Sequence, residues 1–148
     1  MQRRTQRYSK IGDTMKTIDL SGKWNYKTDI DDSQTIDSIK FENNNFNLPG
    51  STCDNHIGKK TEYVDKISKE AVRAPRERYE YIAPLWLQKK VNIPNDTDGK
   101  TVRLFMERVN IASELWIDGV KTDRQIIELS TPHIYNLTGK ITPGEHMF

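Results

Sequence analysis

Apolar and polar residues alternate along much of the chain, and a repeat of two residues predicts β-strands. The alternation is strongest after residue 79. Leu85, Leu87, Val91 and Ile93 alternate with other residues in 85–93, and so do Val102, Leu104 and Met106 in 102–106; further apolar residues follow in 126–129 and 134–137. Pro94 closes the first of these runs, because proline has no N–H to give to a neighbouring strand. The pattern therefore predicts an all-β domain of many short strands.

The clearest single turn is Asp118-Gly119, which separates Leu115 and Ile117 from Val120. A two-residue hairpin needs positive φ at both central positions, and Asp-Gly adopts that geometry readily. We therefore predict a tight β-hairpin at this point.

The first fifty residues give weaker signals. Trp24 and Tyr26 indicate a short strand after the Ser21-Gly22 turn, and the polar residues 30–38 indicate a loop. The remaining predictions are a strand at Ile39 and Phe41, a turn at Asn43 to Asn45, and a strand from Phe46 to Leu48 that Pro49-Gly50 ends.

Residues 51–77 show the least pattern. Val64, Ile67, Ala71 and Val72 fall on one face of a helix that Pro75 would end. A long excursion between strands is, however, more often a functional loop than part of a core. The segment is therefore expected to hold either a short helix between Val64 and Val72 or an irregular loop.

Composition fits one thin sandwich of strands. The 148 residues are 34% hydrophobic and 30% charged, and three Trp, six Tyr and four Phe argue against disorder. Residues 1–16 carry five basic side chains against one acidic one, which predicts a disordered basic leader, with Met1 and Met15 as alternative starts. Residues 17–148 form the predicted domain. The chain ends at Phe148 in what reads as the start of a strand, so we expect the domain to lack its last strand.

Six segments, taken in order, resemble the N-terminal sugar-binding domain of family 2 glycoside hydrolases, the β-galactosidase and β-glucuronidase group. They are Leu20–Trp24 followed by Asp29, Leu48–Ser51, Pro84–Pro94, Gly99–Arg108, Leu115–Gly119, and Thr131–Thr138 with Pro143–His146. Two departures are Leu87, where the family usually has Tyr, and Ala83-Pro84-Leu85 just before it. The resemblance implies a jelly-roll β-sandwich of the galactose-binding type. It also implies a parent enzyme with downstream immunoglobulin-like and (β/α)8 barrel domains that are missing from this chain.

The resemblance also implies that the catalytic groups lie elsewhere. Retaining glycosidases use two carboxyl groups, which the family carries on the barrel, with the acid/base directly after an Asn. This chain contains no Asn-Glu pair. We therefore expect no catalytic residues here, no hydrolysis by the chain alone, and a carbohydrate partner reached through the parent enzyme. A stand-alone carbohydrate-binding module is the alternative.

Candidate binding residues are Asp54 and Asn55, which follow the Pro49-Gly50 turn and carry groups that bind hydroxyls; a plain capped turn is the alternative. The three tryptophans, Trp24, Trp86 and Trp116, offer faces for a sugar ring, although core or inter-domain packing is the stronger expectation.

Two arginines are weaker candidates. Arg76 and Arg78 could contact an acidic sugar or the barrel, but solvated charge is the default expectation for both.

Other function classes find no support in the sequence. His56, His133 and His146 lack metal-ligand spacing, and Cys53 is the only cysteine, so we expect no metal, no cofactor and no disulfide. A basic leader on a mildly acidic remainder does not predict nucleic-acid binding. No apolar run is long enough to span a membrane, and residues 1–16 hold no signal-peptide pattern, which read literally predicts a cytoplasmic location. The family resemblance leaves periplasmic or secreted locations open.

Overall fold

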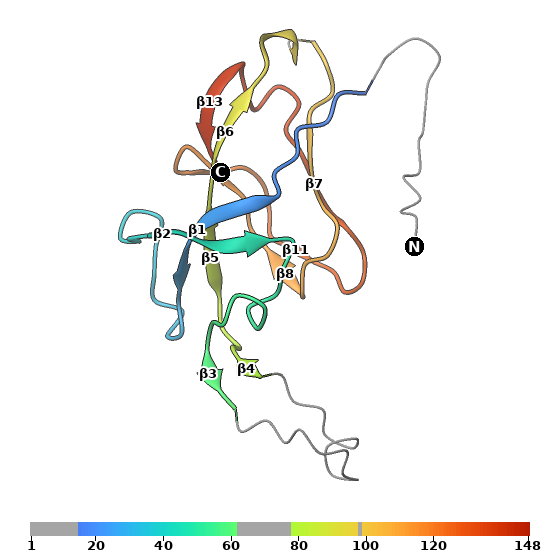
Figure 1. Ribbon diagram of the computed structural model, residues 1–148. Helices are drawn as coiled ribbons and strands as arrows, with labels where there is room; N and C mark the ends of the chain where they lie inside the picture. The colour runs from blue at the N-terminus through green and yellow to red at the C-terminus, as the bar shows by residue number, and fades with distance from the viewer. Residues whose placement is uncertain (1–14, 62–77, 98) are drawn as a thin grey trace.

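The computed structural model describes residues 15–61, 78–97 and 99–148, and the regular secondary structure in this part of the chain is almost entirely β (Figure 1). The helix it contains is one 3-10 turn, η1 (Asn95–Thr97). The thirteen strands are β1 (Gly22–Thr28), β2 (Glu42–Leu48), β3 (Lys59–Lys60), β4 (Tyr79–Glu80), β5 (Leu85–Gln88), β6 (Lys90–Ile93), β7 (Arg103–Met106), β8 (Ala112–Ser113), β9 (Trp116–Ile117), β10 (Val120–Lys121), β11 (Ile126–Ile127), β12 (His133–Asn136) and β13 (Gly144–Met147). The predicted all-β class is confirmed.

All the strand pairs are antiparallel. One sheet has three strands in the order β2-β1-β5, and the other strands pair as β9-β10, β8-β11, β7-β12, β6-β13 and β3-β4. The β3–β4 ribbon projects from the body of the molecule, opposite the end that carries β6 and β13 (Figure 1). The predicted helix between Val64 and Val72 and residues 1–14 of the predicted leader lie outside the described residues.

The predicted turn at Asn43 to Asn45 is wrong, and so is the strand at Ile39 and Phe41. Residues 42–48 form one strand, β2, which pairs with β1. The pairing shifts between Trp24, which faces Phe46, and Tyr26, which faces Glu42. Two extra residues of β2 are absorbed at this bulge. The asparagine run therefore interrupts the register of a strand instead of ending it.

The run at residues 85–93 was predicted as one strand, but it is two. β5 pairs with β1, and β6 pairs with β13. The break falls at Lys89, whose backbone N–H and C=O both bond to Phe148 at 2.9 and 3.0 Å. An alternation of apolar residues shows which face of a strand is buried, but it does not show which neighbour each half of the run pairs with.

The core forms where the inward faces of β7, β9 and β12 meet. Leu115, Ile117, Tyr135 and Leu137 are buried together, with Leu104 among the half-buried side chains packed against them. Leu104, Leu115 and Ile117 thus share an interior, as the alternation predicted. The outward residues of the same strands, Phe105 and Ile134, face each other across β7 and β12 and are exposed. Among the described residues, no helix is long and apolar enough to cross a membrane.

The predicted hairpin at Asp118-Gly119 is present, with φ of +50° and +81° at the two central residues. Its Asp118 carboxylate also accepts hydrogen bonds from β13, from the Met147 N–H at 2.8 Å and from the His146 Nδ1 at 2.6 Å. The other ring nitrogen of His146 lies 2.9 Å from the Thr142 carbonyl oxygen. Because a carboxylate and a carbonyl only accept, the doubly protonated imidazolium satisfies both contacts.

This contact makes a pH dependence testable. The hydrogen bond to Asp118 raises the pKa of His146 above 6.5, against a smaller opposing effect of burial. Because the pKa of His146 is higher in the folded state than in the unfolded state, protonation of His146 stabilises the fold. This stabilisation is fully present below pH 6.5 and is lost as the pH rises through the raised pKa. We expect the difference in melting temperature between wild type and His146→Gln to be largest near about pH 5.5 and to shrink toward about pH 9.

Thermal melts followed by circular dichroism at several pH values measure this difference. Glu145→Gln is the matched control, because Glu145 neighbours His146 on β13 and its ion pair with Lys90 is exposed on both sides. A His146→Gln deficit that stays constant over the pH range would contradict the role of the imidazolium.

Candidate functional site

The segment that carries the predicted binding residues is one tight turn with a hydrogen-bonded cap at its start. The Ser51 hydroxyl accepts the Asp54 N–H at 3.1 Å, and the Asp54 carboxylate accepts the Ser51 N–H at 2.8 Å and its hydroxyl at 2.9 Å. This reciprocal arrangement is a capping box. The Ser51 backbone N–H and hydroxyl lower the pKa of Asp54, which is therefore a carboxylate at neutral pH.

The same turn ends in a Schellman motif. The His56 N–H bonds to the Cys53 carbonyl at 3.0 Å, and the Ile57 N–H bonds to the Thr52 carbonyl at 2.9 Å. In this motif the residue that donates the first bond takes the left-handed conformation, and it is usually glycine. Here it is His56, with φ of +57°. Ile57, which follows, is buried and fixes the turn against the body.

Asn55 holds the turn against β2. Its side-chain oxygen accepts the Asn47 N–H at 2.7 Å, and its amide nitrogen donates to the carbonyls of Asn47 and Ser51 at 3.2 and 2.9 Å. Both amide hydrogens are thus engaged in the fold. Both hydrogen bonds that the Asp54 carboxylate accepts from Ser51 go to Oδ2, and the residue is exposed. Its Oδ1 is therefore better placed to accept an external hydroxyl than the Asn55 side chain is.

Beyond the turn, Gly58 lets the chain pass directly against β4. Its φ is +105°, and a Cβ at this position would overlap the Glu80 carbonyl oxygen and lie 2.9 Å from the Tyr81 Cβ. This close approach starts the β3–β4 ribbon, in which Lys59 faces Glu80 and Lys60 faces Tyr79. The His56 and Tyr79 rings consequently stack, with centroids 5.0 Å apart and planes tilted by 33°.

A second set of hydrogen bonds ties the ribbon to the three-stranded sheet. The Tyr81 hydroxyl accepts the Asp29 N–H at 2.9 Å and donates to the Pro84 carbonyl at 2.5 Å. The buried Asp29 carboxylate accepts the N–H groups of Ser33 and Gln34 and the Trp86 indole N–H. Burial raises the pKa of Asp29, but these donors outweigh it and leave the pKa below its usual value. Tyr81 therefore fixes the direction in which β4 leaves the body.

The three tryptophans are half-buried and pack against other side chains of the protein, which agrees with the expectation of packing. Trp86 and Trp116 lie 6.2 Å apart, and Lys121 sits over the Trp116 ring. The Trp24 indole donates to the Leu20 carbonyl, with Lys89 over its ring. His133 is fully buried between the Ser113 hydroxyl and the Glu128 carbonyl. Arg76 lies outside the described residues, and the Arg78 carbonyl accepts the Thr61 N–H at the end of the ribbon.

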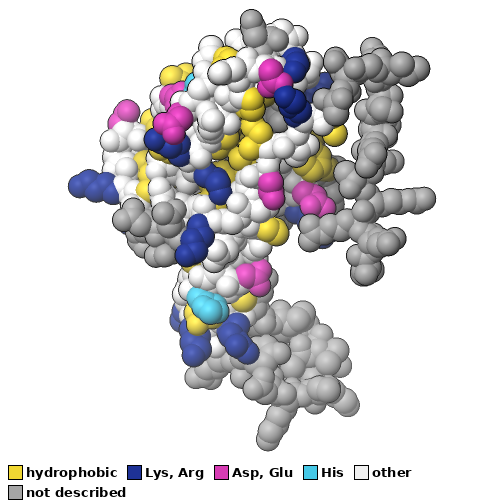
Figure 2. Space-filling view, turned by 45° about the horizontal axis from the view of Figure 1, so that its top comes forward, with side chains coloured by type: hydrophobic (Ala, Val, Ile, Leu, Met, Phe, Trp, Pro, Cys, Tyr) yellow, Lys and Arg dark blue, Asp and Glu magenta, His cyan; other side chains and the backbone are white. Residues whose placement is uncertain are grey.

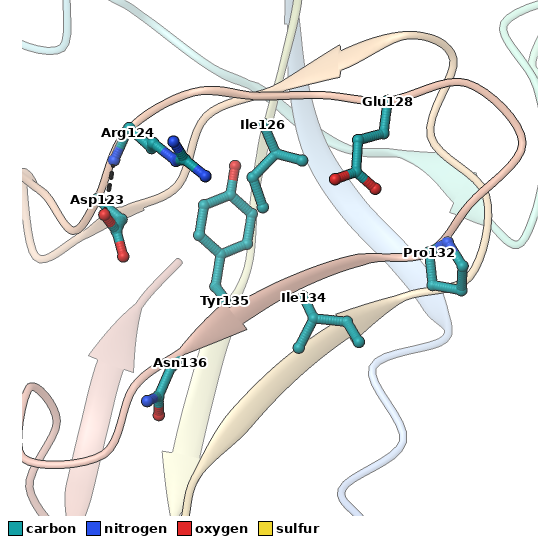
Figure 3. A pocket seen from close by; sticks show the side chains of 8 residues that line it. All are labelled: Asp123, Arg124, Ile126, Glu128, Pro132, Ile134, Tyr135 and Asn136. Carbon is teal, nitrogen blue, oxygen red and sulfur yellow. Dashed lines mark hydrogen bonds between the residues drawn. The ribbon is translucent and has the colours of Figure 1, made fainter.

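A separate groove of about 400 Å³ opens between β11 and β12. Figure 3 shows the Tyr135 ring rising from β12 toward Ile126, with Arg124 beside it and Glu128 directed into the groove from above. The remaining lining residues are Asp123, Pro132, Ile134 and Asn136. The Tyr135 hydroxyl is already bonded to Ser113, and Asp123 pairs with Lys140. The groove is therefore lined by apolar and charged side chains together.

The described residues contain no group of three or more His, Cys, Asp or Glu side chains that could hold a metal ion. Cys53 is a half-buried free thiol within the capped turn. The exposed glutamates are dispersed over the strands and loops, and Glu114 and Glu145 form ion pairs with Lys121 and Lys90. Of the predicted binding residues, Asp54 and Asn55 lie in the capped turn at the base of the β3–β4 ribbon.

The sequence pattern missed part of this arrangement. Asp54 and Asn55 were singled out as candidates, but the stacked His56 and Tyr79 and the neighbouring Lys60 were not. Their pairing depends on a left-handed histidine and on the close passage of Gly58, and neither leaves a periodic signal. A sequence clue was available in His56-Ile57-Gly58 directly after a capping-box pattern, which marks a turn end with an unusual residue.

No protein-family model matches the chain, and no curated protein matches it. Among solved structures, it is similar to a β-glucuronidase from Faecalibacterium prausnitzii, with a TM-score of 0.64 and 19% sequence identity. The similarity covers 95% of this chain and 21% of that enzyme, so the chain spans about a fifth of the enzyme's length. At this identity the likeness establishes the shared all-β fold.

Proposed function

We propose that this chain is the N-terminal accessory domain of a family 2 glycoside hydrolase, with the chemistry carried by other domains of the parent. The observation that carries the proposal is a coincidence of two independent likenesses. Six segments between Leu20 and His146 follow the family's order, and the fold matches part of a β-glucuronidase over 95% of the chain. A jelly-roll sandwich of the galactose-binding type is part of the same proposal.

Within this proposal, the capped turn at Ser51 to His56 is the part that reaches carbohydrate. Asp54 is exposed, ionised and held rigidly by its own turn, which are the properties needed to accept a hydrogen bond from a sugar hydroxyl. Asn55 acts mainly by fixing that turn to β2. In the parent, the turn would stand near the mouth of the substrate pocket.

The sequence that follows the Phe148 codon in the genome tests this assignment. We expect an open frame that encodes an immunoglobulin-like module and then a (β/α)8 barrel with an Asn-Glu pair. A stop codon, or a frame that encodes an unrelated domain, would overturn the parent enzyme and leave the stand-alone carbohydrate-binding module as the better account.

A direct prediction concerns activity. The purified chain should give no turnover on 4-nitrophenyl β-glycosides, because a retaining mechanism needs two carboxyl groups about 5–5.5 Å apart and the family keeps both on the barrel. Release of nitrophenolate is followed by its absorbance, with an intact family 2 enzyme as positive control. Turnover that rises in proportion to the concentration of the chain would contradict the non-catalytic role.

A further inference from the structure

One face of the β3–β4 ribbon gathers an aromatic pair and a cation beside Asp54. Lys60 and Tyr79 are direct cross-strand partners, so their side chains project to the same face. His56 stacks on Tyr79 from the end of the capped turn, and it lies close enough to Asp54 to add a small lowering of the Asp54 pKa to the larger effect of the Ser51 hydrogen bonds. We call these four residues, Asp54, His56, Lys60 and Tyr79, the ribbon platform.

Lys59 and Lys60 differ in what faces them. Lys59 lies opposite Glu80 in the register, so these two side chains project from the other face of the ribbon, although no ion pair joins them within the described residues. Lys60 is paired with an uncharged tyrosine. Within the described part of the chain, no carboxylate lies within ion-pair distance of the exposed Lys60 ammonium. Figure 2 shows Lys and Arg side chains on both sides of a histidine at this end of the molecule.

The backbone at His56 adds a second argument. A non-glycine residue in the left-handed region is strained unless its surroundings enforce that conformation, and such residues cluster at functional sites. Glycine would close this turn without that strain. The side chain that replaces it is exposed, and its one ring contact is with Tyr79. The histidine therefore adds ring surface to the platform and not stability to the turn.

We propose that the ribbon platform binds an acidic saccharide, a pyranose that carries a carboxylate. The negative faces of the stacked rings suit the C–H face of a sugar. Lys60 would pair with the carboxylate at one side, and Asp54 would accept from hydroxyls at the other. This inference extends the carbohydrate role proposed above by naming the class of sugar, and it uses residues of this chain alone.

Titration of the full chain with methyl β-D-glucuronide and with methyl β-D-glucoside, followed by NMR chemical shifts, tests the proposal. We expect saturable binding of the glucuronide and binding of the glucoside weaker by about tenfold or more, since a charge-assisted hydrogen bond is worth about 1.5–3 kcal/mol. Lys60→Gln should remove this preference. Lys59→Gln, one residue away on the opposite face, should keep it.

His56→Gly separates binding from folding. Glycine is the usual residue at this turn position, so the variant should melt at the same temperature as wild type or higher. Its affinity for the glucuronide should nevertheless fall by about fivefold to tenfold, because the stacked ring is lost. Unchanged affinity in this folded variant would overturn the platform.

Three further results would also overturn it: no saturation by the glucuronide, equal binding of glucuronide and glucoside, or equal losses in Lys59→Gln and Lys60→Gln. A failure of the proposed glucuronide site can be distinguished from a failure of the proposal that the chain belongs to a family 2 parent enzyme. If the downstream frame encodes a barrel but the glucuronide does not bind, the accessory domain stands without this site. If the glucuronide binds through Lys60 and no barrel follows, the site stands on a binding module.

Discussion

Tyr135→Ala is expected to remove about 3–5 kcal/mol from the free energy of unfolding, the usual cost of truncating a buried aromatic side chain. Tyr135 is 2% exposed and lies in the central cluster with Leu115, Ile117 and Leu137. Its hydroxyl donates to the Ser113 carbonyl at 2.7 Å and lies 2.9 Å from the Ser113 hydroxyl. Truncation would therefore leave both a cavity and unpaired polar groups.

The hydroxyl belongs to a buried chain of hydrogen bonds. Ser113 Oγ also contacts the His133 Nδ1 at 2.7 Å, and the His133 Nε2 reaches the Glu128 carbonyl at 3.1 Å. This chain joins β8 to β12 through the interior. Burial raises the pKa of the Tyr135 phenol, so it remains a neutral donor through the physiological range.

Urea denaturation measures the effect, with two variants as references. Tyr135→Phe keeps the ring and loses only the hydroxyl, for an expected cost of about 1–2 kcal/mol. Ile134→Ala changes the adjacent, half-exposed side chain on the outer face and should cost under about 1 kcal/mol. Domains of this size are stable by about 5–15 kcal/mol, so the alanine variant would lose a large share of its free energy of unfolding. A cost no larger than that of Tyr135→Phe would show that the ring is not the centre of the core.

The fold class and the central core were predictable because they depend on the alternation of side chains. Leu115 and Ile117 lie two residues apart and share one interior with Leu104, and Asp118-Gly119 makes its hairpin. These are local properties, because the inward face of a strand and the backbone angles of a tight turn depend on residues that are consecutive in the sequence.

Strand partners and register were not predictable in the same way. The run at residues 85–93 splits at Lys89 because its two halves meet different neighbours, and the asparagines of β2 enter a bulge because β1 sets their pairing. Both outcomes are decided by segments distant in sequence. The tertiary pairing overrides the turn propensity of asparagine.

The candidate site was predictable only in part, for a related reason. Asp54 and Asn55 stood out because they follow a turn, and the capped turn itself was one of the two expectations. Lys60 and Tyr79 are separated by 18 residues and meet only through the ribbon register. No local pattern marks which of two adjacent lysines faces an aromatic ring and which faces a carboxylate.

Gly58→Ala is expected to open the β3–β4 ribbon while the sandwich stays folded. The added Cβ would overlap the Glu80 carbonyl oxygen, a backbone atom that cannot rotate away, and φ of +105° is itself unfavourable for alanine. We expect a local cost of about 3 kcal/mol or more, beyond what a ribbon of two-residue strands returns.

Amide hydrogen exchange locates this effect. The Thr61 N–H, bonded to the Arg78 carbonyl at 3.0 Å, should lose protection in Gly58→Ala, while the Leu137 N–H, bonded to the Val102 carbonyl at 2.9 Å, should keep it. Gly139→Ala is the matched control. Its φ is +72°, but no atom lies within 4 Å of an added Cβ, so it tests the backbone strain without the overlap.

The same variant links the ribbon's geometry to its proposed ligand. Gly58 is what allows the chain to bring His56 alongside Tyr79, so an opened ribbon should lose glucuronide binding although all four platform residues are still present. Gly139→Ala should bind like wild type. If Gly58→Ala retains both Thr61 protection and glucuronide affinity, the close approach to Glu80 does not position the platform, and the physical basis of the site has to be sought in the capped turn alone.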